Sequence, residues 1–168
     1  MTVRYLIVDD EPPGRANLRL ALGAHPDWRL VAECDGTAAA RTVLAAQEVD
    51  VIFLDIQMPA ESGLVLAREI SRLRAPPLIV FVTAYSEHAI DAFEVHALDY
   101  LLKPLSDARL AQAVERIGAM LGQRQREAYG AALTRSRENS RSSHRNRTMP
   151  SRSGSDACTS NASMACSL

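Results

Sequence analysis

Five polar side chains suited to phosphate chemistry stand directly after apolar runs of the chain. They are Asp9 and Asp10 after the first run, Asp55 after the third, Thr83 after the fourth and Lys103 after the fifth. Mg²⁺ prefers oxygen ligands such as carboxylates, and a carboxylate beside the metal can itself be the nucleophile that takes a phosphoryl group. A hydroxyl and an ammonium can hold the remaining phosphate oxygens, since the loose transition state is stabilised by positioning and charge. These residue types predict a magnesium-dependent phosphoryl-transfer site.

Asp55 is the candidate nucleophile because it stands alone at the end of its run and faces the Asp9–Asp10 pair. Each residue also has an ordinary structural explanation. An Asp after a strand is commonly a turn or N-cap residue, Lys103-Pro104 is typical of a loop, and Glu11 fits a solvated turn. These explanations cover each residue separately but not their coincidence at four strand ends, so we favour the phosphate site.

The apolar runs have the character of buried strands, and the segments between them have helical spacing. Strands are expected at 5–8, 30–32, 51–54, 78–82 and 98–102, and helices at 15–22, 38–46, 63–73, 87–93 and 108–121. Ser86 and Ser106 stand where the last two helices need N-caps. Alternating strands and helices predict an α/β, doubly wound, five-stranded parallel sheet with helices on both faces. Ligands of such sheets bind beyond the carboxyl ends of the strands, where the five polar residues lie.

Composition and charge exclude several classes of protein. The chain has 168 residues, 47% of them apolar, which suffices for one core. Residues 1–125 carry 12 Lys and Arg against 17 Asp and Glu, so their net charge of −5 argues against a nucleic-acid platform. No segment reaches membrane-spanning length and no signal peptide is evident, so we expect a cytoplasmic protein.

Cysteines and histidines show no ligand spacing. The three cysteines are odd in number and lack a C-x-x-C motif, which indicates neither a disulfide framework nor a zinc site and fits a reducing compartment. Cys34 is interpreted as a strand-end residue of the core, and His25, His88 and His96 as surface or packing residues.

The alternation of strands and helices ends near Gln125. We expect a folded domain at 1–125, a helix extension or linker at 126–133, and a Ser- and Arg-rich, disordered tail at 134–168. Residues 126–168 carry seven Arg against three acidic residues, a net charge of +4. DNA binding by this basic segment is an alternative, but no aromatic residue follows Tyr129, and a solvated tail fits better.

Four stretches of the sequence resemble the response-regulator receiver family over residues 3 to about 125. They are 5–12 (YLIVDDEP), 53–59 (FLDIQMP) with Ser62-Gly63 after it, 82–84 (VTA) and 99–104 (DYLLKP). The resemblance implies a CheY-like, flavodoxin-like (βα)5 fold and a two-component phosphorelay protein, phosphorylated by a sensor histidine kinase. It also implies a homodimer or partner surface formed by the fourth helix, fifth strand and fifth helix.

The resemblance assigns roles by position, with Asp55 as the phosphorylated residue and Mg²⁺ as the required ion. The implied metal ligands are Asp9, Asp10, Asp55 and the backbone carbonyl of Gln57, and the implied phosphate contacts are Thr83 and Lys103. Tyr100 occupies the family's switch-aromatic position, and a half-buried strand aromatic is an equally good interpretation. Phosphorylation is expected to shift an inactive/active equilibrium in which Thr83 and Lys103 turn toward the phosphate.

Within the family, residues 83–85 with 92–100 are similar to the LytR/AlgR class, whose members usually carry a LytTR DNA-binding domain after the receiver. Residues 134–168 have neither the length nor the strand pattern of that domain. The chain is therefore a stand-alone receiver, or a regulator truncated or frameshifted after about Leu133, and DNA is a partner only if a LytTR domain exists. Ala60 replaces a Gly common in the family and should affect only a local turn.

Two other classes also place chemistry after a strand. A haloacid dehalogenase-type aspartyl phosphatase uses a nucleophilic Asp but needs a second acid two residues later, where this chain has Gln57. A flavodoxin or Rossmann nucleotide module fits less well, because residues 9–14 contain no G-x-G-x-x-G. We therefore expect no enzymatic turnover beyond self-catalysed phosphorylation and dephosphorylation.

Overall fold

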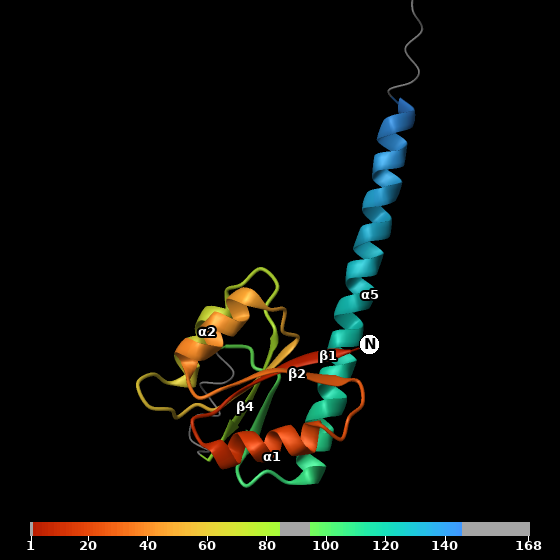
Figure 1. The fold of residues 1–168 in the computed structure, drawn as a ribbon. Helices are drawn as coiled ribbons and strands as arrows, with labels where there is room; N and C mark the ends of the chain where they lie inside the picture. The colour runs from red at the N-terminus through yellow and green to blue at the C-terminus, as the bar shows by residue number, and fades with distance from the viewer. Residues whose placement is uncertain (1, 85–94, 146–168) are drawn as a thin grey trace, which may run out of the picture. The chain divides into compact units, whose positions relative to one another are not determined.

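The computed structural model describes residues 2–84 and 95–145, and side chains of the last helix as far as residue 135. Its strands are β1 (Val3–Val8), β2 (Trp28–Cys34), β3 (Val51–Leu54), β4 (Leu78–Thr83) and β5 (Asp99–Leu102). All neighbouring pairs are parallel, in the order β2-β1-β3-β4-β5 (Figure 1). The predicted α/β class, with its doubly wound five-stranded sheet, is confirmed.

The helices begin where local chemistry favours them. They are α1 (Pro12–Leu22), α2 (Thr37–Ala46), α3 (Gly63–Ser71) and α5 (Asp107–Arg145). Two prolines occupy the first turn of α1, where no backbone N–H is needed. The Ser62 hydroxyl accepts from the Leu64 N–H at the start of α3, and the predicted cap Ser106 accepts from the Arg109 N–H at 3.3 Å. The helix predicted at 87–93 and its cap Ser86 lie outside the described residues.

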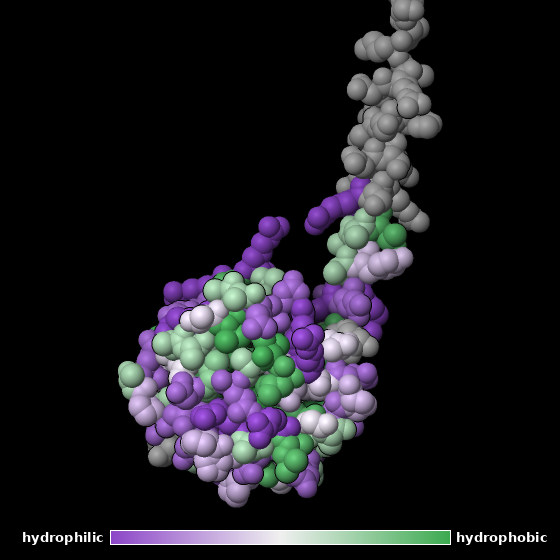
Figure 2. Space-filling view, in the orientation of Figure 1, coloured by the Kyte–Doolittle hydropathy of each residue, from purple (hydrophilic) through white to green (hydrophobic). Residues whose placement is uncertain are grey.

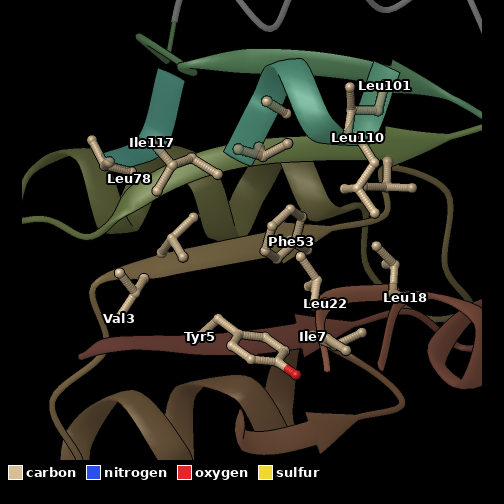
Figure 3. Close-up of a cluster of buried hydrophobic side chains, with 14 of the residues drawn as sticks. Val3, Tyr5, Ile7, Leu18, Leu22, Phe53, Leu78, Leu101, Leu110 and Ile117 are labelled. Carbon is tan, nitrogen blue, oxygen red and sulfur yellow. The ribbon is translucent and has the colours of Figure 1, made fainter. Parts of the chain in front are cut away.

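The sheet separates two apolar layers because successive side chains of a strand point to opposite faces. One layer packs Tyr5, Ile7 and Phe53 against α1 and α5, as Figure 3 shows. The other packs the alternate residues of the same strands against α2 and α3; examples are Leu6, Val8, Ile52 and Leu54. The edge strand β2 is only partly buried, and Figure 2 shows apolar side chains reaching the surface between α1 and α2. Strands β1, β3 and β4 are thus held from both faces, which makes their ends fixed supports for polar groups.

The end of the chain differs from our expectation. The first compact unit ends at Gln125, and α5 is helical through Arg145, whereas disorder was expected from about Thr134. The described helix thus continues past the expected boundary, and the segment between Gly130 and Pro150 contains no Gly or Pro to end a helix. The remaining residues, 146–168, lie outside the description. Among the described residues, no helix is both long enough and apolar enough to cross a bilayer.

Candidate functional site

The register of the central strands brings the predicted site residues to one edge of the sheet. Val8 pairs with Leu54, and the Asp55 N–H donates to the Val8 carbonyl at 2.8 Å, so Asp9 and Asp55 follow neighbouring strands side by side. The Lys103 N–H donates in the same way to the Thr83 carbonyl at 2.9 Å. The polar groups are therefore aligned because the apolar strands that precede them end at the same level of the sheet.

The Lys103 ammonium lies among three carboxylates. Its Nζ is 2.8 Å from Asp9 Oδ2, 2.9 Å from Asp55 Oδ2 and 3.0 Å from Glu11 Oε2. The side chains of Asp9 and Asp55 are 2% and 7% exposed, whereas that of Glu11 is 64% exposed. Three carboxylates around one ammonium leave a net negative charge at this end of the sheet, which favours the binding of a cation.

Lys103 stays protonated in this corner. Burial alone would lower its pKa, but the carboxylates of Asp9, Asp55 and Glu11 outweigh burial and raise the pKa above its usual value. The side chain is therefore a permanent ammonium at neutral pH. It can neutralise an anion but cannot act as a base.

Asp9 is oriented by the first turn of α1. The Glu11 N–H donates to Asp9 Oδ1 at 2.8 Å, and a Cβ on Gly14 would lie 2.4 Å from Asp9 Oδ2. This second oxygen contacts Lys103 but receives no well-directed hydrogen bond from any described residue. A buried carboxylate oxygen in that condition has capacity left for a further ligand.

The loop between β3 and α3, residues 55–62, is called the Asp55 loop. It depends on Gly63, which the sequence indicates only as part of a family motif. A Cβ on Gly63 would lie 2.0 Å from the Asp55 carbonyl oxygen, so no larger residue fits this backbone. The Gly63 N–H and the Ser62 hydroxyl both donate to the Ile56 carbonyl, at 2.8 and 3.0 Å. The Gln57 N–H then donates to Asp55 Oδ1 at 3.2 Å, which fixes the carboxylate. A Ser-Gly pair opening a helix after an acidic strand end was the available signal.

Thr83 and Tyr100 lie on neighbouring strands. Thr83 is fully buried, and its hydroxyl has no hydrogen-bond partner among the described residues. Tyr100 is half-buried, and its ring centroid lies 6.3 Å from that of Phe81. An unsatisfied buried hydroxyl is costly and fits a group that bonds in another state. The switch roles of both residues stay predictions.

The donor set suits Mg²⁺, and two of its three clustered acids, Asp9 and Asp55, are predicted ligands. One oxygen each from Asp9, Glu11 and Asp55 lie within 4.8 Å of one another. Asp10 is half-exposed and outside that group, whereas Glu11, expected to be a solvated turn residue, belongs to it. All donors are hard oxygens, and Asp9 Oδ2 lacks a directed hydrogen bond, so the residues fit the ion.

The remaining candidates are structural. Cys34 ends β2, and burial raises the pKa of its thiol. His25 packs beside Trp28 with ring centroids 5.9 Å apart, and His96 is exposed. Ala60, expected to affect a local turn, adopts a left-handed φ of 70°. His88 lies outside the described residues.

The structure is an α/β domain with a doubly wound parallel sheet. Acids, a hydroxyl and a lysine lie at the carboxyl edge of this sheet, where they could bind a cation and an anion side by side. Residues 5–115 match the family described as the response regulator receiver domain, and the chain belongs to that family. The resemblance seen in the sequence is thereby confirmed, and the protein carries the receiver domain of a two-component response regulator.

Relatives and solved structures agree with this assignment. The sensory transduction protein LytT of Enterococcus faecalis is 42% identical over 121 residues, which are 72% of this chain and 50% of LytT. The transcriptional regulatory protein BtsR of Escherichia coli strain K12 is 45% identical over 115 residues, 68% of this chain and 48% of BtsR. The chain thus spans about half the length of the curated relatives it matches. The likeness to LytT agrees with the LytR/AlgR class.

Two solved structures share the fold. The response regulatory domain of mrkE from Klebsiella pneumoniae has a TM-score of 0.69 and 35% identity, covering 72% of this chain and 99% of that one. The response regulator TrrA from Thermotoga maritima, solved in complex with Mg²⁺-BeF, has a TM-score of 0.63 and 29% identity, covering 69% of this chain and 99% of TrrA.

Proposed function

We propose that Asp55 of this receiver accepts a phosphoryl group from a sensor histidine kinase, with Mg²⁺ held by Asp9, Asp10, Asp55 and the Gln57 carbonyl. The carrying observation is the Lys103 ammonium within 3.0 Å of the buried carboxylates Asp9 and Asp55. A buried acid beside a fixed ammonium is poised to accept an anionic group whose charge the ammonium shares.

The transfer conserves atoms and charge in a simple way. An Asp55 carboxylate oxygen attacks phosphorus as the bond from phosphorus to the donor's histidine nitrogen breaks, and the imidazole leaves with that electron pair. Mg²⁺, when bound, neutralises the phosphoryl oxygens during this exchange. Asp55 is aligned for attack by the Gln57 N–H on Oδ1, which leaves Oδ2 on the Lys103 side.

Lys103 and Thr83 would read the product. Once Asp55 carries phosphate, Lys103 pairs with a phosphate oxygen instead of the free carboxylate, because the more highly charged group attracts it more strongly. The Thr83 hydroxyl, which lacks a partner among the described residues, donates to a second phosphate oxygen. Both moves pull on the ends of β4 and β5.

These movements would shift a pre-existing equilibrium, because the added charge of about −1.5 to −2 interacts differently with the two states. The surface that responds is proposed to be the fourth helix with β5 and α5, and it would contact a second copy or a partner. The fourth helix falls in a part of the chain outside the description. An output on DNA requires a LytTR domain in the intact protein.

Labelling by acetyl phosphate tests the acceptor without needing the kinase. With [³²P]acetyl phosphate and Mg²⁺, wild type should become labelled, and EDTA should prevent labelling. Asp55→Asn keeps the shape of the side chain and should abolish labelling. Asp50→Asn changes an acid outside the site and should label like wild type. Undiminished labelling of Asp55→Asn would show that another residue is the acceptor.

A further inference from the structure

Arg15 holds the peptide that joins Asp9 and Asp10, two of the three acids of the proposed magnesium site. It lies in the first turn of α1, and its Nη1 donates to the backbone carbonyl of Asp9 at 2.6 Å. That carbonyl belongs to the peptide group linking Asp9 to Asp10, so its direction sets how both side chains leave the backbone. The arginine side chain is only 18% exposed, so its conformation is restricted by the residues packed around it.

Strand β2 holds the backbone of Asp9 at its N–H as well. The Asp9 N–H donates to the Cys34 carbonyl at 3.0 Å. Next to Cys34, Glu33 places a carboxylate oxygen 3.9 Å from Arg15 Nε and another 3.3 Å from Arg19 Nη1. Glu33 thus forms ion pairs with both arginines and offsets part of their charge.

We propose that Arg15 is a positioning residue for magnesium binding, acting through the Asp9–Asp10 peptide rather than by touching the ion. Without the guanidinium, this peptide can rotate at the end of β1, and the acids must be ordered when the ion binds. Residues that orient ligands in this way typically change metal affinity by about 10- to 100-fold when they are lost. The proposal rests on the proposed function, which places the ion at the Asp9–Asp10 pair.

Charge and geometry predict opposite effects here, which makes the test decisive. Removing a positive charge near a cation site should tighten Mg²⁺ binding by simple electrostatics. Losing the held peptide should weaken it. We expect the geometric effect to dominate, because Glu33 already offsets part of the guanidinium charge.

Calorimetric titration of the full 168-residue chain with MgCl₂ measures the dissociation constant directly. Arg15→Met should raise it by about tenfold, and Arg15→Lys, which keeps the charge and part of the reach, should recover some of the loss. Arg19→Met removes the neighbouring cation that shares Glu33 but leaves the Asp9 carbonyl untouched, so its constant should stay within about twofold of wild type. Thermal unfolding in EDTA verifies that each variant is folded at the titration temperature.

A second readout separates positioning from general damage. At low Mg²⁺, Arg15→Met should be labelled by acetyl phosphate more slowly than wild type, and saturating Mg²⁺ should remove most of that difference, since the main change is the concentration of ion needed. An unchanged or tighter magnesium constant in Arg15→Met, or an equal loss in Arg19→Met, would overturn the role of Arg15. If wild type itself binds no Mg²⁺, or if Asp10→Asn binds as well as wild type, the proposed site fails instead. If Arg15→Met is unfolded, Arg15→Lys provides the test. A magnesium dissociation constant equal to that of wild type in Arg15→Lys would then contradict the proposal.

Discussion

The two edges of the sheet both carry ion clusters, but they are built differently. At the carboxyl edge, Lys103 faces three carboxylates, and the two buried ones include an oxygen without a directed hydrogen bond. At the amino edge, Arg4 donates from Nε and from its backbone N–H to Asp50 Oδ2, and from Nη2 to Asp50 Oδ1, at 2.8 to 2.9 Å. Both Asp50 oxygens therefore accept hydrogen bonds from Arg4, whereas the carboxyl edge keeps a net negative charge and an oxygen without a directed hydrogen bond.

This difference separates a structural cluster from a reactive one. Arg4 also pairs with Glu48, whose side chain is 84% exposed, so water already solvates much of that cluster. Asp9 and Asp55 at the carboxyl edge are almost fully buried, and buried charges without full compensation are costly in the free protein. A bound cation or phosphate relieves that cost, and the amino edge has no comparable cost to relieve.

The largest effect should come from crowding the Asp55 loop. Gly63→Ala places a Cβ against the Asp55 carbonyl, so the loop must move. We expect the free energy of unfolding to fall by about 2–3 kcal/mol and labelling by acetyl phosphate to be lost. Urea unfolding followed by circular dichroism, with ³²P labelling at a concentration of urea where the variant is folded, measures both. Gly118→Ala is the control, because nothing lies within 4 Å of its Cβ and it should not destabilise α5. Wild-type labelling by Gly63→Ala would contradict the close approach.

Removing the central cation at each edge compares the clusters directly. Lys103→Met should slow labelling by about 100-fold, since a fixed charge on the transferred group is lost. It should also lower thermal stability in EDTA and make added Mg²⁺ more stabilising, because three carboxylates are left without their ammonium. Arg4→Met should cost at most about 1 kcal/mol and show no added response to Mg²⁺. Equal magnesium responses in the two variants would mean that the edges do not differ as described.

Acid titration should affect the amino edge through Asp50. The hydrogen bonds from Arg4 hold the pKa of Asp50 below its usual value. A carboxyl with a depressed pKa in the folded state contributes stability at pH values above the usual pKa of about 3.9, and this contribution is lost as the pH falls through the folded value. Asp50→Asn should therefore be less stable than wild type at pH 6, with a gap that narrows below about pH 4. Urea midpoints at pH 6, 4 and 3 measure this, and a constant gap would exclude the pair.

The smallest effect should be a gain of stability. Ala60 adopts a left-handed φ of 70°, which costs an L-residue about 1–2 kcal/mol. Ala60→Gly should relieve that strain and raise the free energy of unfolding. The net gain should be only about 0.5–1 kcal/mol, because glycine also loses more conformational entropy on folding than alanine does. Labelling should stay near the wild-type rate. Ala45→Gly, at an exposed position within α2, should instead be destabilising by about 1 kcal/mol. A loss of stability in Ala60→Gly would show that the turn is unstrained.

Sequence patterns were sufficient for the framework and for the residues at strand ends. Short unbroken apolar runs specify strands buried on both faces, and the residue after each run must then lie at the sheet edge. That logic predicts Asp9, Asp55, Thr83 and Lys103 at one edge of the sheet, where the strand register has them. The contacts of Glu11 with Lys103 and of Arg15 with the Asp9 carbonyl could not be predicted, since they depend on how far a side chain reaches across the fold.

Composition and structure differ at the end of the described chain. Ser and Arg lower hydrophobicity, which was interpreted as disorder from Thr134, but neither residue breaks a helix and α5 continues through Arg145. The domain division at 125 and 133 stays a prediction. The Ser62-Gly63 pair was a sequence signal for a special turn, but the sequence does not show that Gly63 lies against the Asp55 carbonyl.

The order of the strands has a consequence for signalling. Asp55 follows β3, which has ladders to β1 and β4, whereas Lys103 follows β5, which among the described strands has a ladder to β4 alone. Displacing the lysine disturbs one set of backbone hydrogen bonds, and displacing the aspartate would disturb two. The proposed phosphorylation would thus occur after a strand held on both sides, and the lysine that responds would follow a strand held on one side. A modification of a fixed residue could in this way move a neighbouring, less restrained one.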